Sequence, residues 1–329
     1  MKNNTSEKII RYIFEKKQAT AKELVEYLDI SKQALFKHLS KLLEKNEIFK
    51  IGKPPKVFYL INEEKFIPSS PDKKEIKVQE KIKKIINDNY LIITATGDQK
   101  FGLEGFIYWC EKNNFDASKK AIEYKNIFEK YNKFKKQGLI SGKEKFKNTF
   151  DKVYLNEIYY LDFYSIERFG KTKLGQLLLY AKQSQNKQLT KEIVKIIKPK
   201  IQSIIKKYKV NAIGFIPPTV KREIQFIKEL KKYLDLKAKD ISIVKIKTPL
   251  IVPQKTLNKL TDRIENAKKT IIVDENNKYN NVLLIDDAVG SGATLNETAK
   301  QIKDKKIAKN IIGVSVTGSF KGFDVISEV

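Results

Sequence analysis

One stretch near the C-terminus constrains the fold more than any other part of this 329-residue chain: residues 282–295, VLLIDDAVGSGATL. An apolar run without alternation suits a strand buried on both faces of a parallel sheet. The glycine-rich turn behind it leads into the helical pattern NETAKQIK. Because a helix N-terminus carries free N–H groups and partial positive charge, this order predicts a phosphate cradle in an α/β fold.

Two kinds of side chain stand at this strand end. Asp286 and Asp287 leave its carboxyl end, which is where ligands bind in open α/β sheets. Carboxylates repel a phosphate, so they suit sugar hydroxyls or a metal ion better. The turn offers close backbone approach and hydroxyl donors through Gly290, Ser291, Gly292 and Thr294. The combination predicts a site for a ribose 5-phosphate.

These residues resemble the signature of the type I phosphoribosyltransferase family: an apolar strand, two acidic residues, and a loop of the form xxx(S/T)Gx(S/T). The resemblance implies that Asp286 and Asp287 hold the ribose hydroxyls of phosphoribosyl pyrophosphate (PRPP). It assigns the 5-phosphate to the loop residues Val289, Gly290, Ser291, Gly292, Ala293 and Thr294. The expected cofactor is Mg²⁺ that binds through PRPP, with no direct protein ligand.

The segments before the signature resemble one branch of that family, the competence-associated ComF-like proteins. The strand-like NAIGF and the following IPPTVKRE occupy residues 211–223, and a Q..L…R..N pattern runs through residues 254–266. By analogy the pyrophosphate loop would contain Thr219, Lys221 and Arg222, and a mobile loop closing over PRPP would contain Lys255 and Arg263. The alternative is that these cations are ordinary solvated surface residues.

The first 61 residues form a second informative region. Their pattern is helix, helix, short turn, helix, then two strands joined by Gly52, Lys53, Pro54 and Pro55. This order resembles the winged-helix family of DNA-binding domains, which implies contacts to DNA. In the third helix Leu35, Leu39 and Leu42 share one face, so the opposite face and the wing supply the expected DNA-binding residues: Gln33, Lys37, Ser40, Lys41, Lys53 and Lys56. The alternative is a role in dimerisation or protein contact.

The order of these regions predicts three parts: a winged-helix domain at 1–66, a helical connecting region at 67–150 and an α/β domain at 151–329 with a parallel sheet flanked by helices. Two prolines, Pro68 and Pro71, mark the linker. The aromatic residues of the connecting region could stack on bases, but helical spacing favours a role in the core. We assign this region no function from its sequence.

Charge and cysteine content narrow the function further. The chain has 66 lysines and arginines against 39 acidic residues, a net charge of +27, which favours polyanionic partners. One cysteine excludes an internal disulfide and a cysteine-cluster metal site. The polar start and the lack of a long apolar run predict a cytoplasmic protein that does not contact membranes.

The sequence therefore favours a transcriptional regulator, expected to be a homodimer, that binds DNA and senses PRPP. Purine repressors that join a winged helix to a domain of this type offer the analogy. One alternative is an active phosphoribosyltransferase, although no segment that selects an acceptor base can be identified. Another is a ComF-like role in DNA uptake or processing, which the cysteine-free N-terminus weakens because ComF-like chains usually begin with a cysteine-rich zinc module.

Overall fold

The computed structural model describes residues 5–62, 78–220, 222–246, 248–250 and 252–319, with the side chain of Lys255 left out. The chain divides into two compact units, Met1–Ile76 and Lys77–Val329. Each unit is described by itself. Pro68 and Pro71, expected to mark a linker, lie outside the described residues.

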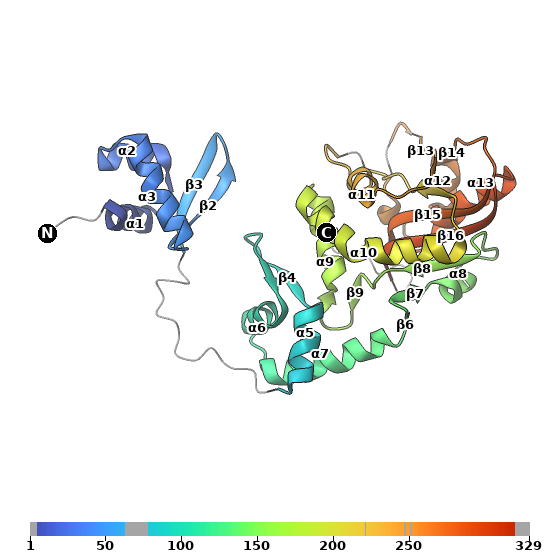
Figure 1. Ribbon diagram of the computed structural model, residues 1–329, viewed down its shortest axis with the longest axis horizontal. Helices are drawn as coiled ribbons and strands as arrows, with labels where there is room; N and C mark the ends of the chain where they lie inside the picture. The colour runs from blue at the N-terminus through green and yellow to red at the C-terminus, as the bar shows by residue number, and fades with distance from the viewer. Residues whose placement is uncertain (1–4, 63–77, 221, 247, 251, 320–329) are drawn as a thin grey trace. The chain divides into compact units, whose positions relative to one another are not determined.

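The N-terminal unit, blue in Figure 1, has three helices and a small antiparallel sheet of strand order β1-β3-β2. Its elements are α1 (Thr5–Lys16), β1 (Ala19–Thr20), α2 (Ala21–Leu28), α3 (Lys32–Glu44), β2 (Ile48–Lys53) and β3 (Lys56–Ile61). Thr20 begins α2 with a capping box to Glu23, and the Ser31 hydroxyl accepts from the N–H of Ala34 to cap α3. The elements occur in the order expected from the sequence.

The second unit is built on a seven-stranded sheet of order β12-β11-β15-β16-β8-β7-β6. The five strands from β12 to β8 are mutually parallel, whereas β7 and β6 continue the sheet in antiparallel pairing. In chain order they are β6 (Lys135–Lys136), β7 (Leu139–Ser141), β8 (Glu157–Tyr160), β11 (Ala212–Phe215), β12 (Lys239–Ile241), β15 (Tyr279–Val289) and β16 (Ala308–Gly318). The mostly parallel α/β sheet flanked by helices agrees with the expected fold class.

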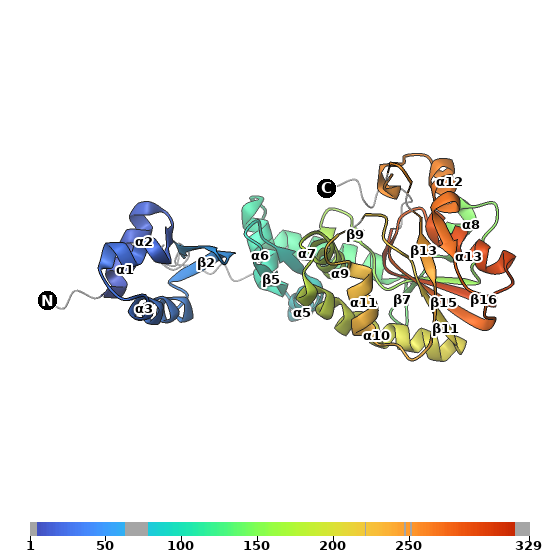
Figure 2. The same ribbon diagram turned by 90° about the horizontal axis from the view of Figure 1, so that it is seen from above.

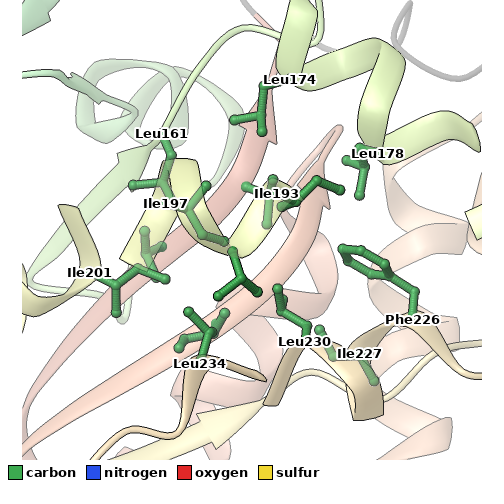
Figure 3. Close-up of a cluster of buried hydrophobic side chains, with 14 of the residues drawn as sticks. Leu161, Leu174, Leu178, Ile193, Ile197, Ile201, Phe226, Ile227, Leu230 and Leu234 are labelled. Atoms are coloured by element: carbon green, nitrogen blue, oxygen red, sulfur yellow. The ribbon is translucent and has the colours of Figure 1, made fainter. Parts of the chain in front are cut away.

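Helices cover both faces of this sheet (Figures 1 and 2). Alternate residues of β15 point to opposite faces, so Leu283 packs with one apolar cluster and Leu284 with the other. The first face is covered by α9 (Lys173–Gln183), α10 (Lys187–Tyr208) and α11 (Phe226–Leu234), whose apolar side chains meet in Figure 3. The second face is covered by α8 (Lys143–Thr149), α12 (Leu260–Thr270) and α13 (Ala293–Asp304).

Residues 78–150 belong to the same compact unit as the sheet, since β6 and β7 extend it. The remaining elements before β6 are α5 (Glu80–Asn89), β4 (Leu91–Ile93), β5 (Gln99–Phe101), α6 (Gly102–Lys112) and α7 (Ala117–Asn132). Phe106 is fully buried and packs edge-on against Tyr90 and Tyr124. The aromatic residues of α6 and α7 thus contribute to a core, as their helical spacing favoured.

Three short two-stranded pairings complete the unit: β4 with β5, β9 (Ser165–Ile166) with β10 (Gly170–Lys171), and β13 (Ile243–Lys245) with β14 (Ile271–Val273). One 3-10 turn, η1, spans Gln254–Thr256. Within the described ranges, no helix combines the length and the apolar character needed to cross a membrane.

Candidate functional site

The predicted strand, bend and helix lie at the carboxyl edge of the parallel sheet. Strand β15 lies between β11 and β16, and its last residues pair with the end of β16, where Val289 is opposite Gly318. The loop after β11 begins beside it, because the N–H of Ile216 donates to the carbonyl of Ile285 over 2.9 Å. Strand β11 ends opposite Ile285, so its loop begins beside the aspartates at the carboxyl edge of the sheet, which is the usual place for a ligand.

Asp286 and Asp287 have different surroundings. The Nζ atom of Lys182, in the last turn of α9, lies 2.7 Å from Oδ2 of Asp287. Oδ1 of Asp286 instead accepts a hydrogen bond of 2.7 Å from the N–H of Asp287. Burial, and next the charge of Asp287, raise the pKa of Asp286 above its ordinary value. The acidic pair thus combines one carboxylate held by a lysine with one carboxyl that favours its protonated form.

The bend after the aspartates has the backbone geometry of an anion site. Gly292 adopts φ +87° and directly precedes α13, with no side chain capping that helix. Among the described residues, the N–H groups of Ser291 and Gly292 have no hydrogen-bond acceptor. The N–H of Ala293 makes a long contact of 3.4 Å to the Ser291 hydroxyl. Free N–H groups at a helix N-terminus are suited to bind a phosphate.

The bend is more enclosed than the sequence indicates, because helix α8 covers it. A Cβ placed on Gly292 would lie 2.2 Å from the Phe146 ring, so the ring rests directly on this glycine. The ammonium group of Lys145 donates to the carbonyls of Gly290 (2.7 Å) and Ser319 (2.8 Å). Burial lowers the pKa of Lys145 to about 8. Ser291 is buried, whereas Gly290 and Thr294 remain partly exposed, so a ligand would approach from their side.

The residues expected in a pyrophosphate loop follow β11, on the strand next to the aspartates. Thr219 is half-buried in this loop, and Lys221 lies outside the described residues. Arg222 donates through Nη1 to the carbonyl of Lys182, the same residue whose ammonium group binds Asp287. The structure therefore brings Arg222 and Lys182 together beside the acidic pair.

The residues expected on a mobile loop are placed differently. Arg263 lies in α12, 8% exposed, and its Nε donates to the carbonyl of Leu257 over 2.7 Å. Gln254 holds the same turn, since its amide donates to the carbonyl of Arg263. Lys255 belongs to η1, and nothing is described of its side chain. Arg263 is thus a buried residue of a helix that fastens the preceding turn, in contrast to the expected loop position.

Oxygen ligands for a metal are few. Within the described part of the chain, no group of three or more histidine, cysteine, aspartate or glutamate side chains could hold an ion. Mg²⁺ keeps several waters and commonly binds through one or two carboxylates plus substrate phosphates, so the donor set fits an ion that arrives with its ligand. Asp286 and Asp287 are the carboxylates available to it at this strand end.

The N-terminal unit presents the polar face that the sequence predicts. In α3, Leu35, Leu39 and Leu42 are buried in the core of the unit. The residues expected to contact DNA are all exposed: Gln33, Lys37, Ser40 and Lys41 on α3, and Lys53 and Lys56 at the tip of the β2–β3 hairpin. His38 instead meets the hydroxyl of Ser6 at 3.1 Å, at the edge of the core.

Sequence reasoning missed the three side chains that hold the acidic pair and the bend: Lys182, Lys145 and Phe146. They lie far from residues 286–294 in sequence; Lys145, for example, is 145 positions from Gly290. A lysine carries no signal of its own in a chain with 66 lysines and arginines. The glycine at position 292 was the one available hint, because a close packing partner requires a residue without a Cβ.

Comparison with known proteins adds little. No family model matches the chain, and no curated protein matches it. Of 26 solved chains that match, one is a hypoxanthine phosphoribosyltransferase from Staphylococcus aureus, with 16% identity and a TM-score of 0.24. The match covers 38% of this chain and 62% of that chain, so this chain spans about three fifths of the length of its match. A similarity this weak carries no argument about function.

Proposed function

We propose that the second unit binds a phosphorylated ribose, PRPP or a close relative, at the end of β15. One observation carries this proposal: the Asp286–Asp287 pair directly precedes a bend whose Ser291 and Gly292 N–H groups are without acceptors among the described residues. The bend supplies donors for a phosphate, and the acidic pair supplies groups for sugar hydroxyls.

The cations beside the acidic pair support a ligand with more than one phosphate. Lys182 and Arg222 meet at the carbonyl of Lys182, and Lys145 reaches the bend from α8. A single 5-phosphate would occupy the bend, so the further cations at Lys182 and Arg222 suit a second anionic group such as a pyrophosphate. Mg²⁺, when bound with the ligand beside Asp286 and Asp287, would neutralise part of the phosphate charge.

We further propose that the N-terminal unit binds duplex DNA and that the chain is a transcriptional regulator, acting as a homodimer, that responds to PRPP. Support comes from helix α3, which buries three leucines and exposes Gln33, Lys37 and Lys41, and from the hairpin with Lys53 and Lys56 exposed at its tip. Lysines contact phosphates, and a glutamine can read adenine through paired hydrogen bonds.

The experiment is a selection of bound duplexes from a random library with the full chain, followed by affinity measurements with PRPP and Mg²⁺ added. Regulation requires that PRPP bind the DNA-competent and incompetent states with different affinity, so DNA affinity must change as PRPP saturates. DNA affinity that stays constant across saturating PRPP contradicts the coupling. Release of pyrophosphate from PRPP in the presence of a nucleobase would instead identify a transferase.

A further inference from the structure

A cavity lies in the same unit, and its lining does not include the bend. It has a volume of about 230 Å³ and opens between the helical segment α5–α7 and the N-terminal end of α9, with α10 at its side. None of Asp286, Asp287 or the bend residues lines it. No role for this cavity follows from the ribose phosphate site.

Part of the cavity wall is aromatic. Tyr124 packs edge-on to Phe169 with ring centroids 5.0 Å apart, and Phe128 stacks on Tyr124 at 6.1 Å. Tyr131 meets Phe163 edge-on at 5.1 Å. All five rings line the cavity. Aromatic faces of this kind bind planar heterocycles by stacking, and they do so for any base because every base has a π face.

The charges around the cavity favour an anion. Four lysines line it against two aspartates, Asp88 and Asp162. One of these lysines, Lys135, already pairs with Asp162 over 2.7 Å and lies 5.8 Å from the centre of the Phe128 ring. Lys200 donates to the carbonyl of Leu161 over 2.9 Å, and burial lowers its pKa, so a bound anion would favour its charged form.

The N-terminal end of α9 adds to this positive field. Thr172 caps the helix, and Thr172, Lys173 and Leu174 all line the cavity. The first turn of a helix attracts phosphate through its N–H groups and dipole. Lys171 also lines the cavity on the adjoining strand β10. Lys171 and Lys173 thus lie at the helix end, whereas Lys135 lies against the Phe128 ring of α7.

We propose that this cavity is a binding site for a mononucleotide, with the base against the partly exposed rings of Phe128 and Tyr131 and the phosphate against Lys200 and the N-terminal end of α9. Its volume is below the range of about 300–1,000 Å³ typical of drug-sized ligands, so it suits one ring system with its phosphate at the mouth. A dinucleotide or a folded polynucleotide is too large for it.

The test is calorimetric titration of AMP, GMP, CMP and UMP into the full chain with ribose 5-phosphate present in excess. The excess sugar phosphate occupies the bend, so heat from a nucleotide reports a different site. A separate titration of ribose 5-phosphate alone shows whether the sugar phosphate binds. If it does not, the variants below still locate the nucleotide site. Trp109, the single tryptophan, has its ring 5.4 Å from Phe169, so its fluorescence should change on binding.

Two variants locate the site. Lys200→Gln keeps a donor for Leu161 but removes the charge, and should weaken nucleotide binding about tenfold, the usual effect of losing a charged hydrogen bond. Ile196→Phe fills the cavity from α10 and should weaken binding at least as much. Lys195→Gln, exposed on the same helix, is the control and should leave it unchanged. The proposal is overturned if none of the four nucleotides binds, or if both cavity variants bind as tightly as the control.

Discussion

The ammonium nitrogen of Lys182 lies 2.7 Å from Oδ2 of Asp287, so the acidic pair at the end of β15 faces a cation from helix α9. Asp287 raises the pKa of Asp286 and Lys182 opposes that rise, with burial as the largest contribution. The pair therefore offers an acceptor in Asp287, which is paired with Lys182, and a carboxyl in Asp286 that can donate as well as accept. That combination suits two neighbouring sugar hydroxyls.

Asp286→Asn should stabilise the protein at high pH. The folded pKa of Asp286 lies above the unfolded value of about 3.9, so the folded state binds this proton more tightly. The associated stability is present at low pH and is lost as the pH rises through the folded pKa. We expect a gain of about 1–3 kcal/mol in unfolding free energy above that pKa and little gain near pH 3.9.

Chemical denaturation of wild type and Asp286→Asn, at a pH above the folded pKa of Asp286 and near pH 3.9, checks this prediction. The exposed Asp151→Asn is the matched control and should show no such pH-dependent gain. If Asp286→Asn is less stable than wild type at high pH, the folded protein stabilises the ionised carboxylate of Asp286. That result would contradict the raised pKa.

Gly292→Ala should destabilise the second unit by more than the backbone conformation alone explains. The residue has φ +87°, and the added Cβ would lie 2.2 Å from the ring of Phe146. Gly97 has φ +91° with nothing within 4 Å, so Gly97→Ala measures the conformational cost alone, about 1–2 kcal/mol. Forced overpacking should add about 1–3 kcal/mol for Gly292→Ala in thermal or denaturant unfolding. Equal losses of unfolding free energy in the two variants would show that the Phe146 ring moves away from the added Cβ at little cost.

Lys145→Gln should weaken ribose 5-phosphate binding about tenfold, because the ammonium group both fixes the carbonyl of Gly290 and places a cation beside the bend. With its pKa lowered to about 8, Lys145 loses its charge as the pH rises through that value. The difference in affinity between wild type and variant should therefore shrink over this range. Lys147→Gln, exposed on the same helix, is the control. A difference that is constant with pH would rule out a contribution from the charge.

Lys37→Gln should weaken duplex binding similarly for all sequences and reduce the slope of log affinity against log salt by about one, as expected for one phosphate contact. Gln33→Ala should instead relax sequence preference at one position. Lys8→Gln, exposed on α1, is the charge-matched control. Binding curves at several salt concentrations check both variants. If the slope of log affinity against log salt for Lys37→Gln equals that of the control, Lys37 does not contact DNA.

The features that the sequence predicts correctly are those set by the spacing of apolar residues within one strand or helix. The run into Asp286 and Asp287 lacks alternation because β15 is buried on both faces, and the leucines of α3 repeat at helical spacing because they share one core. Contacts between distant segments have no such pattern. Lys182 reaches Asp287 across 105 positions, and the short strand Lys135–Lys136 joins the sheet without any apolar periodicity. These placements follow from tertiary packing, and such contacts leave no periodic pattern in a single sequence.

The most direct test of the central claim is calorimetric titration of ribose 5-phosphate into wild type and Asp287→Asn, with 2-deoxyribose 5-phosphate as the ligand-side control. We expect one site per chain, a loss of about tenfold or more in Asp287→Asn, and a smaller loss in that variant for the deoxy ligand, which lacks one hydroxyl. Equal affinity of both proteins for ribose 5-phosphate, or no binding to wild type, would contradict the assignment of the β15 strand end to a phosphorylated ribose.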